Sequence, residues 1–133
     1  MPVPKKILYR KDEITADFFK LVDIHISELL AGKIDYLFHA KHFAEKLFIH
    51  PRHLSNTIKL TTGISPCEIM EDRIMTEAYK MLEQTNMPIA EIGFVFAYND
   101  PTNFTKFFKS MANITPLQYR KNFLLKSIEM PSV

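Results

Sequence analysis

Two segments of the chain, residues 51–60 and 101–110, carry side chains that can recognise DNA. Arginine can donate two hydrogen bonds to guanine and asparagine can pair with adenine, while lysine, serine and threonine suit phosphates or bases. The side chains expected to face outward are Arg52, His53, Ser55, Asn56 and Lys59 in the first segment, and Thr102, Asn103, Thr105, Lys106 and Lys109 in the second. A merely solvated face would more often include Glu or Asp, and neither segment has one.

Both segments are predicted to be helices with one buried face. Leu54 and Ile58 stand four positions apart in the first segment, so they share a face. Phe104 and Phe108 have the same spacing in the second segment. Each helix begins with a proline, which suits a first helical position, and Asp100 can cap the second helix.

A shorter helix is expected before each of these segments, over residues 38–47 and 88–96. The connecting links, FIH and AYND, are short. Helix, short turn, helix is an arrangement that places its second helix in the major groove of DNA. The chain is therefore predicted to contain two helix–turn–helix pairs.

The two pairs repeat each other along the chain. Residues 43–44 have counterparts at 92–93, and later positions match at a distance of 50, so the second turn is one residue longer. The matching positions are Leu54 and Phe104, Ile58 and Phe108, Gly63 and Asn113, Ile64 and Ile114, Ser65 and Thr115, Pro66 and Pro116, and Glu68 and Gln118. A DNA-reading motif is a far stronger signal in two copies than in one.

A long amphipathic helix is predicted between the pairs, from Ser65 to about Asn86. Ser65 and Glu68 form a capping box at its start, and Pro66 suits the first helical position. Its apolar positions at helical spacing are Met70, Ile74, Ala78, Met81 and Leu82. About 20 residues would span about 30 Å, close to the roughly 34 Å of one DNA turn. The sequence thus predicts a spacer between two DNA-reading units.

The other segments complete an all-α fold of about seven helices. A support helix is expected to start at Thr15 and to stop at Gly32, and a final helix to start at Thr115. The expected organisation is a lead-in segment at 1–14, the support helix, first helix–turn–helix unit and linker helix at 15–87, the second unit and final helix at 88–126, and a flexible tail at 127–133.

Charge is distributed unevenly, although the formal net charge is only +2. No acidic residue occurs from Lys46 to Cys67 or from Pro101 to Ile128. Between these blocks, Glu68 to Glu91 contains six acidic residues and two basic ones. Two basic blocks that flank an acidic helix fit two DNA-binding units joined by a spacer.

The cysteine count and the apolar segments indicate a cytoplasmic protein. A single cysteine, Cys67, excludes an internal disulfide. Nothing is similar to a signal peptide, and no apolar run is long enough to cross a bilayer. We expect no membrane partner.

Enzymatic and metal chemistry have little support. His39 with His42, and His50 with His53, have a spacing that could offer two metal ligands, but no Cys or acid recurs beside them at zinc-site spacing. The chain also has no phosphate-binding glycine loop, no Gly-x-Ser-x-Gly and no paired carboxylates in a plausible cleft. We therefore expect a non-enzyme without metal or cofactor, in which His50 and His53 lie near phosphates.

The chain resembles the DNA-binding domain of the AraC/XylS family of bacterial transcription regulators over roughly residues 38–123. The first unit matches at Pro51, Leu54, Lys59 and Gly63. The more specific matches in the second unit are Ile89-Ala90, Asp100-Pro101, Phe104, Phe108-Lys109, Ile114-Thr115-Pro116 and Tyr119-Arg120.

The resemblance implies seven helices, with two recognition helices that enter successive major grooves of double-stranded DNA. It assigns DNA contacts to the ten outward residues named above. Family members often carry a separate sensor or dimerisation domain, which is absent from this chain, so both a complete small regulator and a fragment of a larger one stay open. Phe48 and Ala97 replace turn glycines of the family, Asn113 replaces a common glycine, and Asn103 replaces a frequent aromatic. A left-handed backbone at Ala97 would cost on the order of 1 kcal/mol.

The alternative hypothesis is a helical protein-interaction module that docks on RNA polymerase or a partner regulator and binds DNA weakly. The acidic side chains of the long helix, Glu71, Asp72 and Glu83, could carry such a contact. Salt distinguishes the hypotheses, because duplex binding releases counterions and weakens steeply as salt is added.

Overall fold

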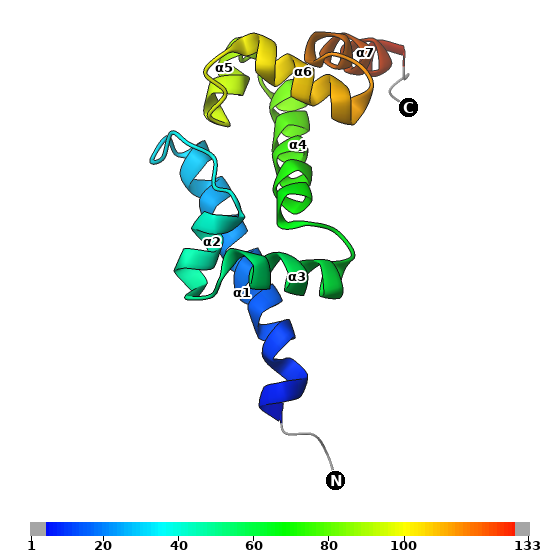
Figure 1. Cartoon of the computed structure of the whole chain (residues 1–133). Coiled ribbons are helices and arrows are strands. Elements are labelled where there is room, and N and C mark those ends of the chain that lie inside the picture. The colour runs from blue at the N-terminus through cyan, green and yellow to red at the C-terminus, as the bar shows by residue number, and fades with distance from the viewer. Residues whose placement is uncertain (1–4, 130–133) are drawn as a thin grey trace. The chain divides into compact units, whose positions relative to one another are not determined.

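The computed structural model describes residues 5–129 of the chain, with side chains from 10 to 128, and every regular element in that range is a helix (Figure 1). The helices are α1 (Lys5–Leu30), α2 (Ala40–Leu47), α3 (Pro51–Thr62), α4 (Pro66–Gln84), α5 (Ile89–Val95), α6 (Pro101–Ala112) and α7 (Pro116–Glu129). The prediction of an all-α fold with about seven helices is confirmed. Contacts divide the chain into two compact units, Met1–Asp72 and Arg73–Val133. The division falls inside α4, whereas the sequence pattern predicts that whole helix in the first unit.

The first unit is built on α1, which packs against α2 and α3. One face of α1 places Ile14, Phe18 and Val22 in the core, each no more than 1% exposed. Phe18 meets Phe43 of α2 edge to face, with ring centroids 5.1 Å apart. Thr15 also shares a 2.7 Å hydrogen bond with Thr61 of α3. The long helix therefore supports both members of the first helix–turn–helix pair.

The second unit packs α5 against α6 and α6 against α7. Its core contains apolar side chains of α4 together with those of the second pair. The buried residues are Ile74, Met75, Ala78, Leu82, Ile92, Phe96, Phe104 and Phe108. Tyr79 of α4 lies against both Phe108 and Tyr119, at centroid distances of 5.5 and 4.7 Å.

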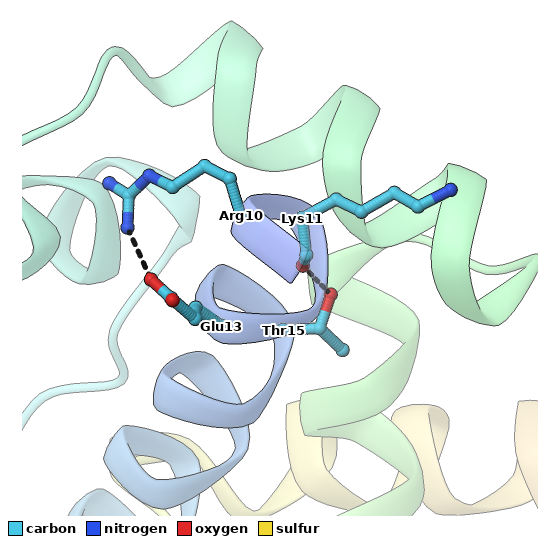
Figure 2. A network of polar contacts seen from close by, with 4 residues as sticks. All are labelled: Arg10, Lys11, Glu13 and Thr15. Carbon is cyan, nitrogen blue, oxygen red and sulfur yellow. Dashed lines mark hydrogen bonds and ion pairs between the residues drawn. The ribbon is translucent and has the colours of Figure 1, made fainter. Parts of the chain in front are cut away.

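The predicted start of the first helix is wrong. α1 begins at Lys5, so Thr15 lies within it and donates its hydroxyl hydrogen to the carbonyl of Lys11 at 2.8 Å. Figure 2 shows this bond beside the contact of Arg10 with Glu13, whose charged atoms are 3.5 Å apart. Ile14 and Phe18 stand four positions apart on the buried face of α1, so the helix is already formed at Ile14 and Thr15 is not its cap. Residues 1–4 of the expected lead-in lie outside the described residues.

The last helix is also longer than expected. α7 continues to Glu129, so residues 127–129 of the expected tail are helical. Residues 130–133 lie outside the described range. The predicted start of α7 is confirmed, because the Gln118 amide donates to Thr115 Oγ1 at 3.1 Å and the Thr115 amide donates to Gln118 Oε1 at 2.9 Å.

Candidate nucleic-acid interface

The first helix–turn–helix pair is α2 and α3, joined by residues 48–50. Ala44 of α2 is fully buried in this pair. Phe48 ends α2 in a left-handed conformation, with φ 59° and ψ 37°, and its amide donates to the carbonyl of Glu45 at 3.2 Å. The chain therefore makes a tight turn here without a glycine.

α3 has a defined cap at each end. The Arg52 amide donates to Nδ1 of His50 at 3.0 Å, and Pro51 occupies the first helical position. At the other end, Gly63 has φ 85° and donates its amide hydrogen to the carbonyl of Lys59 at 2.9 Å. The prediction that Pro51 opens this helix is confirmed, and the imidazole of His50 acts as its cap.

The two faces of α3 separate as the sequence spacing predicts. Leu54 and Ile58 are fully buried, and Thr57 is 6% exposed. Ser55 is half-buried on the flank of the helix. The outward residues that the structure leaves exposed are Arg52, His53, Asn56 and Lys59.

The second pair, α5 and α6, is joined by residues 96–100, and its two helices approach each other closely at Gly93. A Cβ atom placed on Gly93 would lie 2.9 Å from Cβ of Phe104, so only glycine fits there without a shift. Ala97 adopts the left-handed conformation anticipated from its position, with φ 67°. The Tyr98 amide donates to the carbonyl of Gly93 at 3.0 Å, and the Tyr98 ring stacks on Phe107 at 5.6 Å.

α6 repeats the capping and the two-faced character of α3. Asp100 accepts a hydrogen bond from the Thr102 amide at 2.9 Å, and Asn113 ends the helix with φ 66°. Phe104 and Phe108 are fully buried, and Thr105 is half-buried. The outward residues that are exposed on this helix are Thr102, Asn103, Lys106 and Lys109.

His25 supports the segment that leads into α2, a role that no sequence pattern predicts. Its Nε2 accepts the amide hydrogen of Phe38 at 3.0 Å, and its ring stacks on Phe38 at 3.9 Å. Burial, followed by the charges of His42 and Lys46, lowers the pKa of His25 to about 4. The imidazole is therefore neutral near pH 7 and acts as a hydrogen-bond acceptor.

The side chain of Arg120 forms hydrogen bonds at the end of α4 instead of contributing to a basic surface. Its guanidinium donates to the carbonyls of Leu82 at 3.1 Å, Met87 at 2.7 Å and Thr85 at 3.3 Å. The neighbouring Tyr119 hydroxyl donates to Glu83. Burial, then the hydrogen bond and charge of Glu83, raise the pKa of Tyr119 to about 12. These contacts fix the segment that leads into α5.

The histidine pairs considered for metal binding serve as helix caps in part. Nδ1 of His42 accepts the amide hydrogen of His39 at 2.8 Å, as Nδ1 of His50 does for Arg52. Within residues 5–129 no group of three or more His, Cys, Asp or Glu side chains could hold a metal ion. The same part of the chain contains no helix with the length and apolar character needed to span a membrane.

Comparison with known proteins, like the geometry of the two pairs, indicates a helix-turn-helix protein. A family model described as a helix-turn-helix domain matches residues 43–122. The uncharacterized HTH-type transcriptional regulator YisR of Bacillus subtilis is 33% identical over 75 residues, which are 56% of this chain and 26% of that protein. The probable transcription factor PqrA of Proteus vulgaris is 26% identical over 111 residues, which are 84% of this chain and 86% of that protein.

Solved structures extend the match to the fold. The C-terminal domain of AraT, a response regulator from Geobacillus stearothermophilus, has a TM-score of 0.72 and 28% identity, and the match covers 82% of this chain and 84% of that one. The chain belongs to the AraC/XylS family of helix-turn-helix DNA-binding domains. Its fold and family are those of DNA-binding transcription regulators and not of enzymes.

Proposed function

We propose that this chain binds double-stranded DNA in a sequence-specific manner and regulates transcription without being an enzyme, with α3 and α6 in successive major grooves. The observation that carries the proposal is the repeated pair, in which each second helix is capped, opens with proline and has an exposed face without acidic residues. The site of action is the cytoplasm, where bacterial DNA lies.

Residue roles follow from side-chain chemistry and exposure. Arg52, Asn56, Asn103 and Lys106 are exposed and can donate to base edges, with arginine suited to guanine and asparagine to adenine. The remaining outward residues suit phosphates, which accept hydrogen bonds from hydroxyl, ammonium and imidazole N–H groups. Residues in the phosphate-binding set are His53, Ser55, Lys59, Thr102, Thr105 and Lys109.

The half-buried Ser55 and Thr105 are matched positions on the two helices. Their hydroxyl groups lie on the flanks of α3 and α6, which suits contact with the backbone that borders a groove. The exposed donors Arg52, Asn56, Asn103 and Lys106 suit the floor of the groove, where base edges are read.

The experiment is selection of bound sequences from a random duplex pool at about 150 mM salt, followed by titration of the selected duplex. Replacing Arg52 with Ala is expected to weaken binding by about 1 to 3 kcal/mol and to relax preference at one base pair. Lys20→Ala is the matched control, because Lys20 is an exposed cation of α1.

Failure to select any duplex would overturn the proposal. Binding of RNA polymerase or of a partner regulator without DNA, combined with negligible duplex affinity, would establish the protein-interaction alternative instead. An unchanged profile for Arg52→Ala would remove only Arg52 from the base-reading set.

A further inference from the structure

The outward face of α3 includes an apolar side chain among its hydrogen-bonding residues. Leu60 is 72% exposed. It follows Asn56 by four positions and His53 by seven, so all three lie on one face of the helix. Leu54 and Ile58 fill the opposite, buried face. The leucine thus stands one turn beyond a residue expected to contact a base.

Packing of the first unit does not account for Leu60. The next residue, Thr61, shares a 2.7 Å hydrogen bond between its hydroxyl and that of Thr15 of α1. Thr61 therefore lies on the side of α3 that meets α1, and Leu60 lies beside that contact but outside it. The matching position in α6 is Ser110, whose hydroxyl donates to the carbonyl of Phe107 at 2.6 Å. A small polar residue at this position is therefore compatible with the packing of a recognition helix in this fold, and no apolar side chain is required there.

An apolar group on a DNA-facing surface has one base-specific partner. In the major groove, the C5-methyl group of thymine is the apolar feature that base edges present, whereas phosphates line the borders of the groove. Four residues of α-helix rise about 6 Å, and base pairs are about 3.4 Å apart. A leucine one turn beyond Asn56 therefore reaches a base pair about two steps away.

We infer that Leu60 is a specificity-determining residue that packs against a thymine methyl group, within about two base pairs of the base that Asn56 contacts. This inference rests on the proposed function, because it requires α3 to lie in a major groove. It adds an apolar contact of the first unit that the second unit, with Ser110, does not have.

The test replaces each thymine of the selected duplex, one at a time, with deoxyuridine. This change removes the methyl group and leaves base pairing intact. Loss of one buried methyl group should weaken binding by the wild-type protein about fourfold at one position near the Asn56 base. The Leu60→Ala protein should bind the thymine and deoxyuridine duplexes equally at that position.

Leu124→Ala is the matched control, because Leu124 is a 54% exposed leucine of α7 outside the proposed reading face. That variant should keep the wild-type sensitivity to deoxyuridine. Three results would overturn the inference while the protein still binds the duplex: no sensitive thymine, a sensitive thymine that Leu60→Ala leaves unchanged, or equal weakening of all duplexes by Leu60→Ala. Absence of any duplex binding would overturn the proposed function as well.

Discussion

Left-handed backbone at residues other than glycine marks the turns of both helix–turn–helix pairs and the end of α6. Phe48 and Ala97, in the two turns, have φ of 59° and 67°, and Asn113, which ends α6, has φ of 66°. Asparagine tolerates this conformation, but for other residues that carry a Cβ atom it costs about 1 to 2 kcal/mol of stability. Phe48 is also 93% exposed, so burial of its side chain contributes little stabilising free energy to offset this cost.

Replacing Phe48 with Gly should raise the free energy of unfolding by about 1 kcal/mol, because glycine adopts positive φ without strain. Urea denaturation measures this change. Phe48→Ala is the matched control, since it removes the ring and keeps the strain, and it should leave stability nearly unchanged. A less stable Phe48→Gly protein would show that the phenylalanine ring packs in the folded protein.

His25 should make the stability of the first unit depend on pH. Its pKa of about 4 lies below the ordinary value of 6.5, so the unfolded chain takes up the proton first as pH falls. Stability is therefore full above pH 6.5 and decreases as pH falls toward about 4, by up to about 3 kcal/mol, because the side chain is only 1% exposed.

The His25→Gln variant isolates this effect, because a glutamine carbonyl can accept the Phe38 amide hydrogen and does not titrate. The four other histidines are present in both proteins. The stability difference between wild type and variant, measured by urea denaturation from pH 7 to pH 4, should change in favour of the variant. A difference that is constant over this range would contradict the prediction.

At the scale of the helix, the two pairs differ in the small buried residue on the first helix of each pair. The first pair has Ala44 where the second has Gly93, and a Cβ at Gly93 would meet Phe104 at 2.9 Å. Gly93→Ala should therefore destabilise the protein by about 1 to 3 kcal/mol through overpacking. Helix propensity alone would stabilise it by about 1 kcal/mol, so the sign of the change measured by thermal unfolding decides between the two effects.

The end of α4 should depend on Arg120. Arg120→Met keeps much of the side-chain length but removes the donors to Leu82, Thr85 and Met87, so we expect a loss of about 2 kcal/mol in urea denaturation. Lys121→Met, at an exposed neighbouring position, should change stability by less than about 0.5 kcal/mol. Similar losses in both variants would mean that the hydrogen bonds of Arg120 contribute nothing measurable.

Helix ends could be predicted from the sequence where a local signal marks them. Ser65, Asp100 and Thr115 all accept an amide hydrogen near the start of the expected helix. The start of α1 was missed because Thr15 looks like a cap, although its hydroxyl serves a contact inside the helix. The role of Arg120 was missed because its carbonyl partners are more than 30 residues away and leave no local pattern.

The candidate site was predictable to a similar extent. Periodicity identified the outward faces of α3 and α6, since Leu54, Ile58, Phe104 and Phe108 are all fully buried. It could not distinguish the half-buried Ser55 from exposed neighbours, because flank positions depend on the packed helices. Leu60 escaped notice because an apolar residue at the end of a polar segment is normally assigned to the core.

At the scale of the whole molecule, binding should be governed by local charge rather than by the net charge of +2. The logarithm of the duplex binding constant should fall linearly with the logarithm of salt concentration. Lys59→Ala should reduce the slope by about 1, because one phosphate contact is lost. Lys20→Ala on α1 should leave it unchanged, and a salt-independent affinity in the wild type would contradict duplex binding.

The hydrogen bonds of Arg120 also have a consequence for synthesis of the chain. α1, α2 and α3 pack on one another and end at Thr62, so these three helices can meet early in translation. The carbonyls of Leu82 near the end of α4 and of Met87 just after it can accept the Arg120 hydrogen bonds only once residue 120 has left the ribosome. A nascent chain can therefore pack its first recognition helix well before the segment that leads into α5 is fixed.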